Sequence, residues 1–210
     1  MQISSKQIDI KPEQITSLLN KNYGSVMSSF LENQSSFLIG VYKRYNSIEA
    51  ANIVLCYARD MHLQIIRQKE VKLNFDISLN NFFNNLEIVE KPAEKISYIV
   101  KNTSIPKETV RRQIKNLLAV GHLDNNKIRK GFYWNLVPKQ KASYKKIIGE
   151  EIDMFARFTS KFSNLLNLNL SIKEIKNEIE MNFSFYWFHY LTCQLLWLKI
   201  WQTNLKTMNY

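Results

Sequence analysis

Apolar side chains recur at steps of three and four along most of this chain, which is the spacing of one face of an α-helix. The pattern is strongest over residues 48–69, at Ile48, Ala51, Val54, Leu55, Ala58, Met61, Ile65 and Ile66. Five glycines and four prolines in 210 residues leave few helix breakers. The sequence therefore predicts a mainly α-helical fold with long helices rather than a β-sandwich, which needs many tight turns.

N-terminal helices are expected at 12–20, at 25–45, where the pattern is weaker, and at 48–69. Ser47 precedes the strongest of them and predicts an N-cap, because a serine hydroxyl can accept a hydrogen bond from the free amides of the first turn. Residues 70–90 are polar and rich in asparagine, and they are compatible with either a short helix or a loop. We expect them to connect the N-terminal helices to the next segment.

The C-terminal region is again helical in pattern. Apolar residues keep helical spacing over 144–165, and Ser171 with Glu174 forms a capping-box pattern before a second run. That run, 171–206, is either one long helix or two helices broken near Asn182.

Residues 183–201 are strongly apolar and aromatic. A membrane span needs about 20 predominantly apolar residues with few charges, and this segment includes several polar side chains and Lys199. We therefore expect no membrane span. A stripe of aromatic side chains is too large to leave exposed to water, and it predicts a helix that is either buried in its own chain or part of a homodimer interface. The stripe comprises Phe183, Tyr186, Tyr190 and Trp197.

No set of residues has the spacing of a metal site, a phosphate-binding glycine loop or an activated nucleophile. Cys56 and Cys193 each fall in an apolar helical pattern and are expected to be buried. Glu150 and Glu151 are expected on a solvated helix face. Residues 1–14 lack the apolar core of a signal peptide. We therefore expect a cytoplasmic protein with no catalytic activity, no cofactor and no metal.

The net positive charge of the chain comes from one segment. The sequence has 29 Lys and Arg and 18 Asp and Glu, a net charge of +11. Between Lys91 and Lys146 lie 14 of the basic and 3 of the acidic residues, so the remaining 15 and 15 cancel. Because Lys and Arg neutralise phosphates, such a basic patch is the expected footprint of a nucleic-acid partner.

Within the basic segment the sequence predicts two helices and a hairpin. Pro92 is suited to begin the first helix, and after a turn a second helix covers 106–119. Gly121 would end that helix in the left-handed conformation. A polar turn and a run of β-favouring aromatic residues then predict a hairpin at 124–134 with a basic tip, and Pro138 would close the unit.

The string IPKETVRRQIKNLLAVGHL, with the turn before it and the hairpin after it, resembles the recognition helix of bacterial winged-helix transcription regulators. The likeness is to the broad class that includes the MarR-like and GntR-like families, and it covers residues 92–138. It implies a central winged helix-turn-helix with a small β-hairpin wing, flanked by N- and C-terminal helices. It also implies sequence-specific binding of double-stranded DNA to regulate transcription. The flanking helices would then hold a dimer interface or a ligand pocket, and any small-molecule effector is unknown.

This interpretation divides the chain into three parts. An N-terminal helical region covers 1–90, a DNA-binding domain covers 91–140, and a C-terminal helical region at 141–210 would dimerise. A dimer would set two recognition helices against half-sites about one turn of DNA apart.

Helical geometry assigns the expected DNA contacts. With Val110, Ile114 and Leu117 facing inward, the opposite face of 106–119 points outward. Arg112 is the expected base reader, because arginine can donate two hydrogen bonds to guanine. Beside it, further base contacts are expected from Thr109 and Asn116. Glu108 is expected either to accept a hydrogen bond from a cytosine amine or to orient Arg112 or Arg111. Phosphate contacts are expected from Ser104, Lys107, Arg111 and Lys115, and wing contacts from Lys127, Arg129 and Lys130.

Two other functions fit the same residues. A winged helix can dock a protein instead of DNA, which would make the chain a helical protein-interaction or membrane-associated module. A basic hairpin with Tyr133 and Trp134 could also stack the bases of single-stranded RNA. Packing in the core of the hairpin is the simpler explanation for these two residues.

Overall fold

The structure, a computed structural model, describes residues 10–207. In this range it has nine helices and one two-stranded antiparallel sheet, so the predicted mainly α-helical fold is confirmed. The elements are α1 (Pro12–Lys21), α2 (Tyr23–Tyr45), α3 (Ile48–Val71), α4 (Leu79–Ile88), α5 (Ile96–Thr103), α6 (Lys107–Ala119), β1 (Leu123–Asn126), β2 (Gly131–Trp134), α7 (Pro138–Leu165), α8 (Ile172–Met181) and α9 (Phe183–Thr207). The prediction that no signal peptide is present concerns residues 1–14, of which 1–9 lie outside the described residues.

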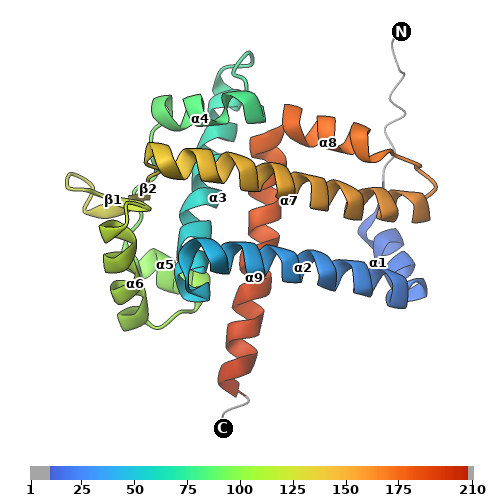
Figure 1. Cartoon of the computed structure of the whole chain (residues 1–210), viewed down its shortest axis with the longest axis horizontal. Coiled ribbons are helices and arrows are strands. Elements are labelled where there is room, and N and C mark those ends of the chain that lie inside the picture. The colour runs from blue at the N-terminus through green and yellow to red at the C-terminus, as the bar shows by residue number, and fades with distance from the viewer. Residues whose placement is uncertain (1–9, 208–210) are drawn as a thin grey trace.

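Two antiparallel pairs of long helices cross each other to form the body of the molecule. α2 and α7 run side by side in opposite directions and pass in front of α3 and α9 in Figure 1. α3 and α9 are also antiparallel and share the most extensive contact between any two elements described. α5, α6 and the β1–β2 hairpin lie at one end and α1 at the other, and the last turns of α9 extend beyond the body (Figure 1).

Several helix ends lie where the sequence predicts them. The Ser47 hydroxyl accepts a hydrogen bond from the Ala50 amide at 3.2 Å and caps α3. Ser171 and Glu174 form the predicted capping box at the start of α8. Asn182 separates α8 from α9, so the last predicted run is two helices rather than one.

One of the two predictions based on proline was wrong. Pro92 does not begin a helix, because α5 starts only at Ile96. Between them, Glu94 pairs antiparallel with Phe132 of β2 through backbone hydrogen bonds of 2.8 and 2.9 Å. This isolated β-bridge ties the segment before α5 to the hairpin. Pro138 follows the hairpin and opens α7 at the first helical position, where the missing N–H of proline costs nothing, so a new helix begins where the sequence predicted the unit to end.

α3 is the central helix of the core. Its side chains Ile53, Tyr57 and Ile65 are shielded from water. A helix that is buried on all sides needs neighbours on all sides, and α2, α5, α6 and α9 pack around it. The position of α3 therefore decides how the terminal helices and the basic segment meet.

The asparagine-rich segment that the sequence left ambiguous forms α4 and supplies the central ring of an aromatic cluster. Phe82 is fully buried. Its ring stacks on His62 of α3 with centroids 4.8 Å apart and meets Phe183 of α9 edge-on at 5.1 Å. Trp134 of β2 and Tyr144 of α7 lie 6.3 and 6.5 Å from it. One side chain thus joins α4 to the hairpin and to three long helices.

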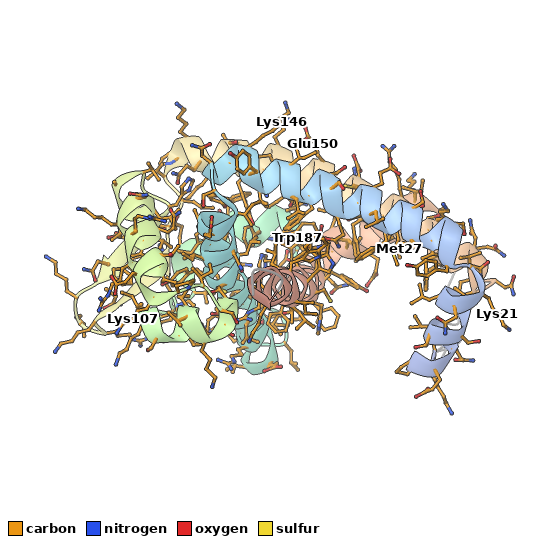
Figure 2. The ribbon with its side chains drawn as sticks, turned by 90° about the horizontal axis from the view of Figure 1, so that it is seen from below. Lys21, Met27, Lys107, Lys146, Glu150 and Trp187 are labelled. Atoms are coloured by element: carbon orange, nitrogen blue, oxygen red, sulfur yellow. The ribbon has the colours of Figure 1, made fainter. Side chains whose placement is uncertain are left out.

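The predicted aromatic stripe of α9 faces the interior of its own chain. Phe183 and Tyr190 are buried, and Tyr186 and Trp197 are half-buried against the core. Figure 2 shows Trp187, another residue of α9, in the interior of the molecule. Of the two predicted alternatives for this stripe, the structure therefore shows the buried helix, while the homodimer stays a prediction. No helix within residues 10–207 is both long and apolar enough to cross a membrane.

Two predictions about single residues were also wrong. Cys56 is buried as expected, but Cys193 is exposed. Glu151 does not lie on a solvated face; it is buried and forms an ion pair with Arg44 of α2 at 2.8 Å, whereas Glu150 is exposed. Burial raises the pKa of the Glu151 carboxyl, and the Arg44 guanidinium opposes that rise.

The aromatic cluster predicts a large loss of stability for Phe82→Ala. This change should lower the unfolding free energy by about 3–5 kcal/mol, the range for large buried aromatic side chains. Urea denaturation followed by circular dichroism gives the value. Ile88→Ala, on the exposed side of the same helix, is the matched control and should change stability by less than about 0.5 kcal/mol. Similar small losses for both variants would show that Phe82 does not hold these elements together.

His62 should make stability depend on pH. Its ring is buried, neither nitrogen is hydrogen-bonded to a described residue, and burial lowers its pKa to about 3. The unfolded chain, with an ordinary histidine pKa of about 6.5, binds a proton that the folded chain does not bind. The contribution of His62 is therefore fully present above about pH 6.5 and decreases as the pH falls toward 3, by about 2 kcal/mol between pH 7 and pH 5.

The measurement is urea denaturation at both pH values for the wild type and for His62→Leu, which removes the titrating group. The wild type should lose about 2 kcal/mol more than the variant on going from pH 7 to pH 5. Equal losses would show that His62 is protonated in the folded chain.

Candidate nucleic-acid interface

Residues 104–106 join α5 to α6 in a tight turn. The hydroxyl of Thr103 donates to the carbonyl of Ile99 at 2.8 Å and accepts from the amide of Ile105 at 3.2 Å. Thr103 and Ile105 are both buried. Ser104, a predicted phosphate contact, is half-buried in the turn with a left-handed φ of 59°. The turn is thus held from inside, which sets the direction in which α6 leaves it.

α6 packs on the core through the side chains that the sequence predicted. Val110, Ile114 and Leu117 are buried, and the helix contacts α3 and α5. The Gln113 amide also donates to the Ser47 hydroxyl at the start of α3, at 3.2 Å. These contacts leave the opposite face of α6 directed to solvent.

A polar cluster fastens α5 to α3. The hydroxyl of Tyr98 donates to the Asp60 carboxylate at 2.9 Å and accepts from Arg59 at 2.8 Å. Arg59 and Asp60 also form an ion pair at 2.7 Å. Burial raises the pKa of Asp60, and both partners oppose that rise. The helix pair therefore has a fixed position relative to the core.

The outward face of α6 carries most of the predicted contact residues. Exposed on it are Lys107, Glu108, Arg111, Arg112, Lys115 and Asn116, while Thr109 is half-buried. Glu108 and Arg111 form an exposed ion pair at 2.7 Å. Arg112, the expected base reader, makes no side-chain ion pair or hydrogen bond within residues 10–207. Figure 2 shows Lys107 at the edge of the molecule on α6, pointing away from the body.

The end of α6 leads directly into the hairpin. Gly121 has a φ of 77°, the left-handed conformation that the sequence predicted, and its amide donates to the Leu118 carbonyl at 3.1 Å. In the hairpin, Leu123 of β1 lies opposite Trp134 of β2, and both are buried. Trp134 is therefore a core residue, as predicted.

The tip of the hairpin is basic, as predicted. Lys127, Arg129 and Lys130 are exposed. The Asn126 side chain accepts from the Arg129 amide at 2.9 Å and shapes the turn. The Arg129 side chain forms an ion pair with Glu90, which links the tip to the segment after α4. Lys127 and Lys130 have no such partner among the described residues.

Tyr133 and Ile128 differ from what the sequence suggested. Tyr133 is half-buried rather than in the core; its hydroxyl donates to Asp124 at 2.9 Å, and the Lys91 ammonium lies 5.2 Å from its ring centroid. Ile128, which the sequence analysis missed, is 94% exposed at the hairpin tip. The sequence signal for it is a single apolar residue between Lys127 and Arg129.

Further exposed cations lie beside the hairpin on the first turns of α7: Lys139, Lys145 and Lys146. These three lysines belong to the basic segment of the sequence, but no DNA contact was predicted for them, because the winged helix was expected to end at Pro138. They broaden the basic surface beyond α6 and the hairpin. Figure 2 shows Lys146 on the outer edge formed by α7, apart from Lys107.

Comparison of the chain with protein-family models, with curated proteins and with solved structures found no match. Within residues 10–207 no three His, Cys, Asp or Glu side chains are arranged to hold a metal ion. The geometry and charge of the basic surface are therefore the features that bear on function.

The close approach of Gly131 to the backbone of Ala93 and Glu94 predicts the effect of Gly131→Ala. An added Cβ would lie 3.0 Å from the Ala93 carbonyl and 3.1 Å from the Glu94 oxygen, and both are backbone groups that cannot simply rotate away. The change should cost about 1–3 kcal/mol of stability. Amide hydrogen exchange at Glu94 and Phe132 should also become faster.

Gly149→Ala is the matched control, since a Cβ at that position of α7 meets nothing within 4 Å. It should leave exchange at the hairpin unchanged. Unaltered exchange in Gly131→Ala would contradict the close packing of the hairpin on the backbone of Ala93 and Glu94.

Proposed function

We propose that the chain is a sequence-specific DNA-binding regulator of transcription that acts in the cytoplasm without catalysis. One observation carries the proposal. The outward face of α6 and the hairpin tip present exposed cations, and they lie in the segment that holds all of the net positive charge. Phosphate neutralisation dominates affinity for DNA, so this surface has the charge that a duplex requires.

The proposed motif is a winged helix-turn-helix. The three-residue turn between α5 and α6 fits a helix-turn-helix, and the β1–β2 hairpin that follows would be its wing. α6 would enter the major groove, which admits one α-helix. The wing would lie on the backbone or in the adjacent minor groove, where the exposed side chain of Ile128 adds an apolar contact.

The contacts of each side chain support different roles. Arg112 is the proposed base reader, because its side chain is exposed and has no partner within the described chain. Arg111 is held by Glu108, so it suits a phosphate contact better than base recognition. Thr109 and Asn116 would contact bases beside Arg112. The remaining proposed phosphate and wing contacts are Ser104, Lys107, Lys115, Lys127, Arg129 and Lys130.

The proposed regulator is a homodimer through the outer face of α9. Phe185, Cys193, Leu196 and Ile200 are exposed there at helical spacing. α9 has no charged residue before Lys199, so two copies of this face can pair without burying a charge. Exposed apolar side chains on one helix face, with the exposed His189 between Phe185 and Cys193, are compatible with an interaction site, and two copies would supply two recognition helices.

The test is selection of bound sequences from random duplex DNA at about 150 mM salt, where non-specific phosphate binding is weakened. We expect a motif with two-fold symmetry. On that motif, Arg112→Ala should lose about 1–3 kcal/mol of binding free energy at one base pair of each half-site and relax the preference there.

Lys107→Ala is the matched control on the same helix. It should weaken binding to all sequences alike and reduce the salt dependence by about one phosphate contact. Selection of no motif, with weak binding that disappears as salt rises, would contradict the proposal and favour the protein-interaction module. Stronger binding to single-stranded RNA than to duplex DNA would favour the RNA-binding alternative.

A further inference from the structure

The first turns of α7 present a row of basic side chains to solvent. Lys139 and Lys146 are separated by about 10 Å along the helix axis and lie on the same side of it, because seven residues make nearly two turns. Both are exposed, and so are the small residues Ala142 and Ser143 between them. Neither lysine forms an ion pair or a side-chain hydrogen bond within residues 10–207. We refer to the face formed by these four residues as the α7 strip.

Two further cations flank the α7 strip. Lys145 is exposed beside it, and Lys43 of α2 is exposed and lines the same cavity between α2 and α7 as Lys139. On the same face of α7, the exposed carboxylate of Glu150 lies one turn beyond Lys146. The strip therefore presents positive charge up to Glu150, and the small side chains between its lysines leave room for the close approach of a phosphate backbone.

The stability of α7 itself does not favour a lysine at this place. The N-terminus of a helix is the positive end of its dipole, so an acid in the first turn is favourable and a cation is unfavourable. α7 has no acid in its first turn, where Lys139 lies, and no basic residue in its last turn. The charges at the two ends of α7 thus do not serve the helix, and those of the first turns suit an anion that binds from outside.

The α7 strip adjoins the proposed recognition helix. The carbonyl of Val120, the residue that ends α6, accepts from the Gln140 side chain at 2.9 Å. Gln140 accepts in turn from the Val137 amide at 3.1 Å. α6 is about 20 Å long and the major groove is about 12 Å wide, so the ends of α6 would lie near the two backbones of a duplex that holds it. One backbone would therefore pass close to Lys139.

The basic surface does not lie in one plane. Figure 2 shows Lys107 on α6 and Lys146 on α7 at different edges of the molecule. A straight duplex seated on one of these edges leads away from the other. DNA that bends over the hairpin end can reach both, and the additional phosphate contacts offset the cost of bending.

We propose that the α7 strip is a second phosphate-binding surface and that the bound DNA bends toward it. This inference rests on the proposed DNA-binding function and extends it, because a bent duplex is also selected by how easily its sequence deforms. Pyrimidine–purine steps bend most easily. They should therefore recur in the selected motif at a position that no side chain of α6 reads.

The contact is tested by phosphate ethylation interference on the selected motif, which identifies the phosphates that binding requires. The wild type should require a group of phosphates that the double variant Lys139→Gln/Lys146→Gln does not. The slope of log affinity against log salt should also fall by about two, one for each lost phosphate contact. The base preference should stay unchanged, because phosphate contacts do not read sequence.

Lys21→Gln/Lys173→Gln is the matched control. It removes two exposed lysines of α1 and α8, and Figure 2 shows Lys21 at the end of the molecule opposite the hairpin. Charges much farther apart than about 8 Å are screened at physiological salt. The control should therefore leave the required phosphates and the salt dependence as in the wild type.

Ser143→Glu tests the α7 strip without removing a lysine. It places a carboxylate between Lys139 and Lys146, where the new charge repels a phosphate. Affinity for the selected motif should fall at least about fivefold, the effect of two like charges about 4 Å apart in water. Ser143 is exposed, so the melting temperature should not change.

The bend is measured by fluorescence energy transfer between dyes at the two ends of a duplex that carries the motif at its centre. Binding of the wild type should bring the two ends closer together. Lys139→Gln/Lys146→Gln should bring them less close when the DNA is saturated with protein, a condition that separates the bend from the affinity.

The outcomes separate this inference from the proposed function. The same required phosphates and the same end-to-end distance in both double variants would overturn the α7 strip and leave the DNA-binding function standing. A straight bound duplex that still requires the additional phosphates would overturn the bend. Selection of no motif would overturn the proposed function and this inference with it.

Discussion

The ring of Phe82 packs between His62 of α3 and Phe183 of α9, and this contact joins the hairpin to the helical body. Trp134 of β2 and Tyr144 of α7 lie against the same cluster. Protein interiors are close-packed, so a displacement of one ring must be taken up by its neighbours. The proposed DNA-binding surface and the long helices therefore share one core. Any movement of α7 or α9 reaches the hairpin through these rings.

Charge plays different roles inside and outside this molecule. The buried pair of Arg44 and Glu151 connects α2 to α7. Removing two charges from water is costly, so such a pair is better suited to fixing the relative position of helices than to adding stability. The exposed cations of α6 and the hairpin remain solvated and are screened by salt. The exposed cations of α6 are accordingly suited to the phosphates of a long duplex.

The sequence predicted features that depend on near neighbours. The inward side chains Val110 and Ile114 of α6, the cap at Ser47 and the left-handed Gly121 follow from helical periodicity and local backbone chemistry. The exposed face of the candidate interface could be predicted for the same reason. Proline was a poorer guide, because a single local signal suits a strand edge as well as a helix start. The pairing of Glu94 with Phe132 depends on a partner far along the chain, which no local pattern names.

By itself, then, the sequence determined most of the long helices, the caps at Ser47 and Ser171, and the location of the net positive charge in one segment. These properties depend on side chains within about one turn of each other or on composition alone. Only the tertiary structure decided that the aromatic stripe of α9 faces inward, that Glu151 forms an ion pair with Arg44, and that Phe82 packs on His62 of α3. It also created a cavity between α2 and α7, whose walls come from distant parts of the chain. Periodicity shows that a helix has an apolar face, but only packing decides what that face meets.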